Sequence, residues 1–271
     1  MARGLGVGKS TGRLLQTHGP SLGVLLAGVL LWEAGVRALQ VPAFVLPRPS
    51  AVAGMLVSRH DLFLRHALPT TQEILLGFLA STLVGIPVAI GIVYSRVFER
   101  VSYTVIVAFQ TIPKTALAPL FVLWFGFGLL SKVAVAFLIA FFPIVVNTVI
   151  GMRSVEPETI YLAQSLGATP LQVFLKVRLP RALPSIFGGL KVAITLAVVG
   201  AIVGEYIAAN EGLGYIQLQA NSNLDTVMLF ATIAVLSALG IVLFYAVGVL
   251  ERLVVRWRPG EEQLEAARET L

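Results

Sequence analysis

The chain contains no cysteine, and only three of its 271 residues are histidine. The absence of cysteine excludes disulfide bridges, thiolate metal sites and thiol nucleophiles. No two of the histidines are spaced to bind a metal ion from one helix face, so the sequence predicts no metal site. No pairing of serine and histidine with a supporting acid is apparent either, and we expect no catalytic residue in this chain.

Charged residues are also scarce, since they make up 13% of the sequence. Soluble domains contain about 25%. Apolar residues make up 57%, and the mean hydropathy is +0.88. This composition predicts a multi-pass membrane protein. The formal net charge of +6 comes from Lys and Arg in short segments between apolar runs, which positive-inside sorting explains without a nucleic-acid partner.

Six apolar stretches are long enough to cross a bilayer as helices of about 20 residues. They predict an all-α polytopic membrane protein with six transmembrane helices. The first stretch could instead be a signal-peptide core, but it lacks a convincing cleavage site, so we interpret it as an uncleaved span. The expected spans are residues 21–39, 70–94, 101–124, 129–152, 183–208 and 226–250.

The distribution of Lys and Arg predicts the orientation of these spans. With both termini cytoplasmic, most of the 20 basic residues lie inside the cell. Residues 209–224 contain neither Lys nor Arg, which suits an outside position. The basic residues expected outside are Arg37, Arg48, Arg59, Arg65 and Lys132.

Residues 151–190 form the longest polar interruption between apolar stretches, and this orientation places them in the cytoplasm. Pro157 suits the first turn of a short helix, and Gly167 suits the left-handed turn that ends one. Thr169 is placed to cap a second short helix, which we expect Leu179-Pro180 to end. The pattern predicts a helix, a glycine elbow and a helix. An ordinary loop on the membrane surface is the alternative.

This stretch resembles the cytoplasmic loop of the permease subunits of ABC importers, where the loop contacts the ATPase. The family pattern is EAA, three residues, G, nine residues, I, one residue, LP. Tyr161 and Leu162 stand where the pattern has Glu and Ala. The resemblance implies that this part of the chain couples it to an ATPase. The residues at or beside the positions of the pattern are Tyr161, Leu162, Ala163, Gly167, Ala168, Val177, Leu179 and Pro180.

The third apolar stretch is interrupted by Pro113 and Pro119, and a proline within a helix usually kinks it. Lys114 follows the first proline. A lysine within a span costs about 2.5–3.5 kcal/mol to insert, so it should face protein or water. We interpret these three residues as part of a translocation path that favours an anionic or polar solute. Snorkelling of Lys114, or its pairing with Glu73 or Glu33, is the alternative.

Glu205 lies near the outer end of the fifth stretch. We interpret it as a residue of the path that lines an outer gate or receives a basic group from a solute-binding protein. The alternative is an interfacial carboxylate that ends the span. After it, residues 212–215 (GLGY) have the composition of a turn, and Asn223 or Asp225 can cap the sixth span.

Further segments resemble the permeases for nitrate, sulfonates and taurine, in the same order along the chain: VPAFVLPRPSAV, IPK with APL and WFGFG, and GLGY. The resemblance covers about residues 20–255. It implies a type I ABC importer transmembrane domain with a coupling-helix loop at about 153–182. The expected segments are a cytoplasmic N-terminal segment (1–20), a first span with a periplasmic linker (21–66), a permease domain (67–251) and a cytoplasmic tail (252–271).

The resemblance implies an ATP-driven importer in the bacterial inner membrane. It implies a second, identical permease copy, two ATP-binding subunits and a periplasmic or lipid-anchored solute-binding protein, besides membrane lipid. ATP and magnesium would bind to the partner ATPase, because this chain has no phosphate-binding loop and is expected to bind no cofactor. The solutes of the family are nitrate, bicarbonate, sulfonates, taurine, thiamine-precursor pyrimidines and riboflavin.

The alternative function is a secondary transporter that works without an ATPase. It would need a coupling-ion site and usually inverted repeats, and no convincing internal repeat is seen. An intramembrane enzyme would need paired catalytic groups at membrane depth, which Lys114 and Glu33 do not supply.

Overall fold

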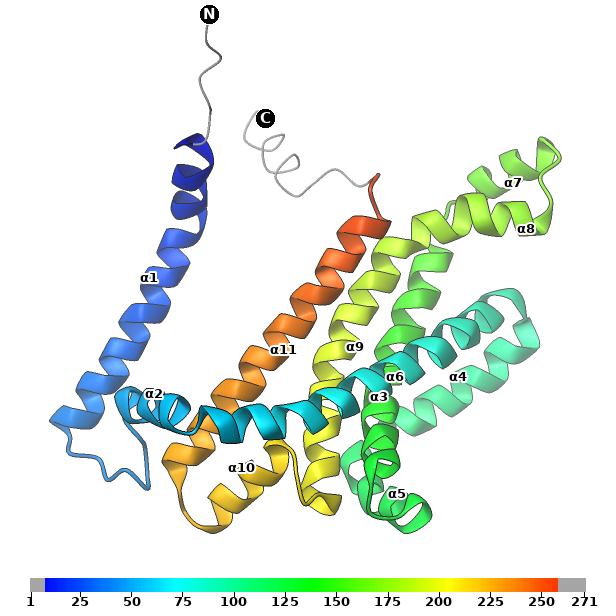
Figure 1. The fold of residues 1–271 in the computed structure, drawn as a ribbon. Helices are drawn as coiled ribbons and strands as arrows, with labels where there is room; N and C mark the ends of the chain where they lie inside the picture. The colour runs from blue at the N-terminus through cyan, green and yellow to red at the C-terminus, as the bar shows by residue number, and fades with distance from the viewer. Residues whose placement is uncertain (1–7, 258–271) are drawn as a thin grey trace, which may run out of the picture. The chain divides into compact units, whose positions relative to one another are not determined.

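The computed structural model describes residues 8–257, and they form helices and loops without a strand (Figure 1). The all-α prediction is confirmed. The described residues fall into two compact units. Within residues 8–257, the first unit extends to Phe63 and includes Gln217–Ile233, and the second consists of Leu64–Ile216 and the residues from Ala234. The predicted segment boundaries stay predictions, and residues 1–7 and 258–271 of the two terminal segments lie outside the described residues.

The first unit joins α1 (Gly8–Ala38) to α2 (Pro49–Ser58) through the predicted proline-rich turn. The Glu33 carboxylate accepts hydrogen bonds from the Ser50 N–H (3.0 Å) and from its hydroxyl (2.9 Å) at the start of α2. Arg37 donates to the same carboxylate (2.7 Å). A carboxylate is favourable at this position because the first N–H groups of a helix have no partner within it. Glu33 therefore fixes the beginning of α2.

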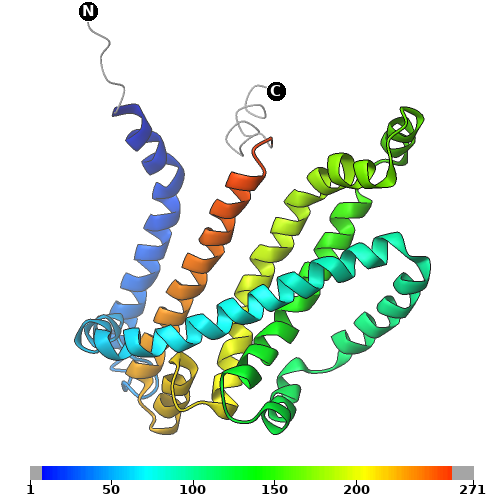
Figure 2. The ribbon, with the colours of Figure 1, turned by 45° about the vertical axis from the view of Figure 1, so that its right-hand side comes forward.

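The second unit is built around α6 (Leu129–Arg153) and α9 (Leu179–Ala208), which run side by side in Figures 1 and 2. Small residues let the two backbones approach. A Cβ atom at Gly200 would lie 2.6 Å from Cα of Ala136, so only glycine allows this contact. Helices in a membrane associate mainly through such close packing, because lipid offers no hydrophobic drive between them.

The helix α3 (His60–Tyr94) packs against α6 by the same means, since a Cβ at Gly77 would overlap Ala136. Together α3, α6 and α9 enclose the main apolar core, with Ile74, Ile144 and Ile194 fully buried. The last long helix is α11 (Thr226–Val254). Asp225, one of the two predicted capping residues, caps its first turn, because its carboxylate accepts from the Met228 N–H (3.0 Å). The helix α11 is preceded by α10 (Leu213–Ser222), where we expected only a turn.

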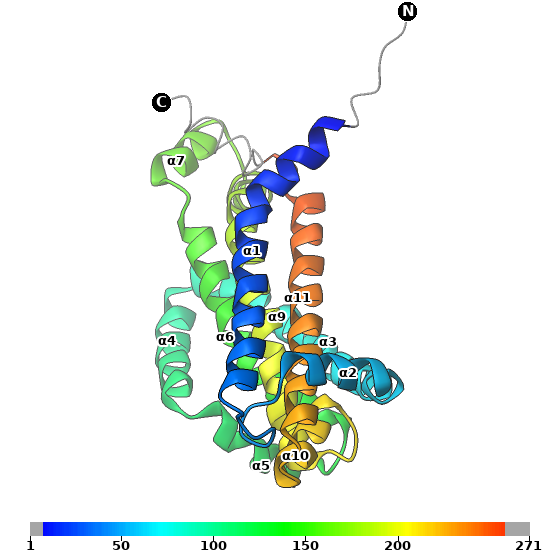
Figure 3. The ribbon, with the colours of Figure 1, turned by 90° about the vertical axis from the view of Figure 1, so that its left-hand side faces the viewer.

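The third predicted span is broken into three pieces: α4 (Arg96–Thr111), a short 3₁₀ turn η1 (Lys114–Leu117) and α5 (Ala118–Phe125). The helix α4 stops before Pro113, whose ring and missing N–H are incompatible with a continuing helix. Pro119 lies in the first turn of α5, where a proline costs nothing. Figure 3 shows α5 at the end of α6 that is opposite to α7 (Pro157–Ser165).

Four described helices are long and apolar enough to cross a membrane: His60–Tyr94, Leu129–Arg153, Pro170–Ala208 and Thr226–Val254. They contain the second, fourth, fifth and sixth predicted spans. The first predicted span lies on α1 except for its last residue, and the third lies on the broken segment. The total of six spans stays a prediction.

The prediction that Leu179-Pro180 ends a helix is wrong. The helix α8 (Pro170–Val173) continues through one π-helical turn, η2 (Phe174–Arg178), into α9. In an α-helix the Pro180 ring would press on the carbonyl four residues earlier. The π turn widens the helix there, with the Leu179 N–H donating to the Phe174 carbonyl. The second short helix is therefore the beginning of a membrane-spanning one.

Candidate functional site

The predicted elbow is confirmed between α7 and α8. The helix α7 begins at Pro157, and Gly167 has a φ of +83°, which glycine adopts without strain. Thr169 and Gln172 form a capping box: the Gln172 N–H donates to the Thr169 hydroxyl (3.3 Å), and the Gln172 side chain accepts from the Thr169 N–H (2.9 Å). The bend is therefore formed by residues that are close together in the sequence.

The two short helices expose large apolar side chains around the elbow. Tyr161 and Leu162, which replace the Glu and Ala of the family pattern, are 66% and 63% exposed, and Leu166 is 80% exposed. In the second short helix Leu171 is exposed, whereas Val173 is buried. Other pattern residues lie nearer the core and are half-buried: Ala163, Ala168, Val177, Leu179 and Pro180.

A cavity of about 380 Å³ lies beneath α7, and two arginines are among its lining residues. Arg153 pairs with Glu99 (2.7 Å). The Arg178 guanidinium lies 5.3 Å from the centre of the Tyr94 ring, in the arrangement of a cation–π contact. These contacts connect the end of α6 to the start of α4, and the η2 turn to the end of α3.

Lys114 lies at the break in the third stretch and is half-buried. Its ammonium group lies 5.1 Å from the centre of the Phe142 ring on α6. The alternative pairing with Glu73 or Glu33 is not formed, because these carboxylates pair with Lys132 and Arg37. Within the described part of the chain, Lys114 makes no ion pair.

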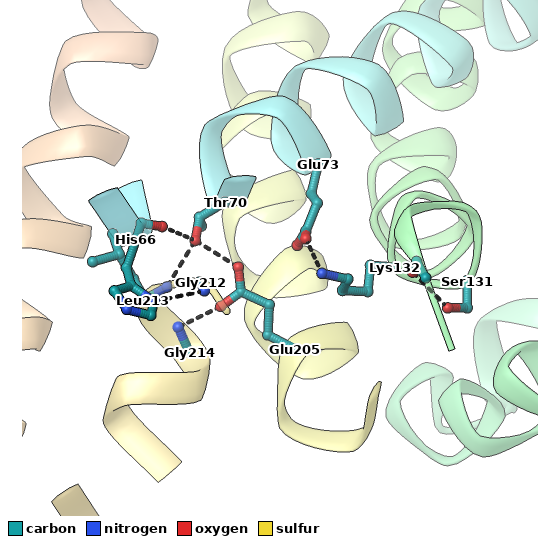
Figure 4. Close-up of polar contacts among 10 residues, drawn as sticks. His66, Thr70, Glu73, Ser131, Lys132, Glu205, Gly212, Leu213 and Gly214 are labelled. Atoms are coloured by element: carbon teal, nitrogen blue, oxygen red, sulfur yellow. Dashed lines mark hydrogen bonds and ion pairs between the residues drawn. The ribbon is translucent and has the colours of Figure 1, made fainter. Parts of the chain in front are cut away.

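Glu205 belongs to a buried polar cluster at the end of α9 (Figure 4). Its side chain is 1% exposed. The Thr70 hydroxyl donates to Glu205 Oε1 (2.5 Å), and the Gly214 N–H donates to Glu205 Oε2. Glu205 is therefore enclosed by the protein, three residues before α9 ends at Ala208. Its place on a translocation path stays a prediction.

Side chains hold three successive N–H groups at the start of α10. The Gly212 N–H donates to Nδ1 of His66 (3.0 Å), the Leu213 N–H donates to the Thr70 hydroxyl (2.8 Å), and the Gly214 N–H donates to Glu205. These N–H groups have no partner within the helix, so the cluster satisfies them. Any Cβ at residue 212 would overlap the Glu205 carboxylate, which explains why the GLGY segment needs its first glycine.

The cluster also contains an ion pair that the sequence reading missed. Lys132, assigned to an outside segment, lies in the first turn of α6, is 5% exposed and pairs with Glu73 on α3. Glu73 lies near the beginning of the second predicted span, residues 70–94. The sequence contained a signal for this ion pair, because ionisable residues within membrane-spanning segments usually pair with one another.

Comparison with known proteins decides the family. Residues 77–256 match the model of the family described as binding-protein-dependent transport system inner membrane component. The chain belongs to this family. It is the permease subunit of a binding-protein-dependent ABC importer and an integral protein of the inner membrane.

Curated relatives align with the permease over nearly its full length. The formylaminopyrimidine transport permease protein ThiX of Halalkalibacterium halodurans is 40% identical over 91% of this chain and 98% of its own. The riboflavin transport system permease protein RibX of Chloroflexus aurantiacus is 40% identical over 88% and 91%. The taurine transport system permease protein TauC of Escherichia coli is 31% identical over 90% of each chain.

Solved structures show the same fold. The MetNI methionine ABC transporter, in an inward-facing conformation, matches 73% of the permease and 97% of its own chain with a TM-score of 0.60 and 22% identity. An amino acid ABC transporter crystallised with histidines matches with a TM-score of 0.57 and 19% identity. The predicted type I importer fold is confirmed.

The predicted site residues of the permease lie in three separate places. The coupling residues lie around the elbow, between the end of α6 and the beginning of α9. Pro113, Lys114 and Pro119 lie on the broken segment. Glu205 lies in the buried cluster at the other end of α9. About 26 residues separate it from the η2 turn, which corresponds to about 39 Å of helix at 1.5 Å per residue.

Proposed function

We propose that this permease forms the membrane path for a small polar solute of the pyrimidine or flavin class. The observation that supports it is the 40% identity to the formylaminopyrimidine and riboflavin permeases, against 31% to the taurine permease, over similar lengths. Nitrate, bicarbonate, taurine and sulfonates are the other members of the expected solute class. A periplasmic or lipid-anchored binding protein delivers the solute.

The exposed apolar surface around the elbow docks on an ATPase. Tyr161, Leu162 and Leu166 are large side chains on short helices that project past the ends of α6 and α9 (Figure 1). Exposed apolar groups gathered in this way favour a protein partner. ATP hydrolysis, with its ATP and magnesium, belongs to that partner. The uninterrupted helix from Pro170 to Ala208 carries movement at the docking surface into the membrane.

The working importer contains two copies of this permease, two ATP-binding subunits and the binding protein, in membrane lipid. Both termini are cytoplasmic, as the distribution of Lys and Arg favours. Lys114, Pro113 and Pro119 line the path. Among the described residues the Lys114 ammonium group contacts an aromatic ring and forms no ion pair, so it remains able to attract an anionic or polar solute. Glu205 closes the outer end of the path by holding the start of α10.

A binding screen on the partner solute-binding protein tests the solute class. Titration calorimetry with formylaminopyrimidine, riboflavin, taurine and nitrate should give heat of binding with one of the first two alone. The loaded binding protein should then stimulate ATP hydrolysis by the reconstituted importer. Binding of taurine or nitrate, with neither heterocycle bound, contradicts the proposed class and leaves the permease role intact.

A further inference from the structure

The polar cluster of Figure 4 contains more negative than positive groups. Its charged members are Glu73, Lys132 and Glu205, which come from α3, α6 and α9 and are 0%, 5% and 1% exposed. Two carboxyl groups therefore share one ammonium group away from solvent. If both were ionised, one negative charge would be buried without a counter-charge, which is strongly unfavourable.

The other titratable groups near the cluster, among the described residues, do not supply the missing positive charge. His66 on α3 accepts the Gly212 N–H at Nδ1, so this nitrogen carries no proton and the ring is neutral. Tyr215 on α10 stacks on His66, with 6.2 Å between ring centres. Tyr206 on α9 lies within electrostatic reach of Glu205. Neither tyrosine side chain can carry a positive charge.

The hydrogen bonds indicate where a proton is needed. Glu205 already accepts from the Thr70 hydroxyl and from the Gly214 N–H. Glu73 Oε1 faces the Lys132 ammonium, whereas Oε2 is buried and has no hydrogen-bond donor among the described residues. Figure 4 shows the Glu73 and Glu205 carboxyl groups as neighbours, and the two groups interact electrostatically. If Oε2 of Glu73 carried a proton, this oxygen would donate a hydrogen bond to the Glu205 carboxylate.

We propose that Glu73 and Glu205 form a buried proton-binding site, in which one proton shared by the two carboxyl groups balances the charge of the cluster. The proton joins α3 to α9, and Thr70 and Gly214 extend this junction to the start of α10. Loss of the proton places two like charges side by side, and their repulsion weakens the junction. The packing of these helices is therefore linked to pH.

Infrared spectroscopy of the purified permease in detergent at neutral pH tests the site directly. We expect the carbonyl stretching band of a protonated carboxyl group, shifted in D₂O. The band should disappear in Glu73→Gln and in Glu205→Gln, because either change removes the surplus carboxyl group and leaves the other ionised beside Lys132. A wild-type spectrum without the band, or its persistence in both variants, would overturn the proposal.

Glu251→Gln is the matched control. Glu251 pairs with Lys191 on α9 (2.5 Å), so this pair has one carboxylate for one ammonium group and needs no additional proton. The protonated-carboxyl band should remain in this variant. Its disappearance there would assign the band to a different site and contradict the proposal.

The pH dependence of stability gives a second, independent readout. The folded permease holds a proton that the unfolded chain releases at lower pH, so stability is present in acid and lost as pH rises. We expect the wild-type melting midpoint to fall as pH rises, because loss of the shared proton places two like charges side by side in the folded permease. The decrease should be absent in Glu73→Gln and present in Glu251→Gln. Equal profiles for all three proteins would refute the shared proton. If Glu73→Gln fails to fold, Glu205→Gln carries the comparison, and if both fail, the wild-type infrared band decides.

Discussion

Gly167→Val changes the elbow of the coupling loop without creating a clash. The φ of Gly167 is +83°, and a Cβ atom built there meets nothing within 4 Å. The cost therefore comes from the backbone alone, about 1–2 kcal/mol for a residue with a side chain in the left-handed region. This energy reduces the ratio of bent to unbent elbows by a factor of about 5–30. The spans are stabilised separately, so the variant should still insert.

The assay is the yield of co-purified ATPase and the hydrolysis of ATP that loaded binding protein stimulates. We expect both to fall in Gly167→Val, because α7 tends to continue and turns the exposed apolar surface away from the ATPase. Gly188→Val is the matched control: Gly188 also has open space around its Cβ position, but it lies inside α9. The control should keep both properties. Full retention of the ATPase and of stimulated hydrolysis in Gly167→Val would refute the role of the elbow.

Three further variants test other parts of the account. Lys114→Met should insert and assemble normally but lower solute uptake; unchanged uptake at equal expression would favour snorkelling. Asn210 is exposed in a chain without cysteine, so Asn210→Cys should react with an impermeant thiol reagent in intact cells, and labelling only in opened cells would contradict the orientation. Thr70→Val leaves two buried partners unpaired, at about 1–3 kcal/mol each, and should lower the melting midpoint. Thr82→Val should have a smaller effect, because that hydroxyl donates only to the carbonyl four residues earlier (2.8 Å); equal effects would contradict the importance of the cluster.

Local features of the coupling loop could be predicted because neighbouring residues decide them. Pro157, Gly167 and Thr169 act within one turn of themselves, and all three lie where their chemistry requires. Apolar length was similarly sufficient for four of the spans. The end expected at Leu179-Pro180 was wrong, because a π turn absorbs a proline that an α-helix could not accommodate.

The buried cluster could not be predicted because its contacts join residues that are far apart in the chain. Thr70 and Glu205 are separated by 135 positions, and the segment pattern gives no sign that α3 crosses α9 at this point. The distribution of Lys and Arg placed Lys132 outside the membrane. Only the packing of α3, α6 and α9 shows that it faces Glu73. The two glycines of GLGY were likewise recognisable as a turn, but not as the space for a carboxylate.

Uptake into proteoliposomes tests the central claim most directly. The permease is reconstituted with its ATPase, ATP is enclosed on the ATPase side, and labelled solute is supplied with the binding protein on the other side. The account predicts uptake that needs ATP, the ATPase and the binding protein together. Uptake by the permease alone, driven by an ion gradient without ATP, would contradict the account and support a secondary transporter.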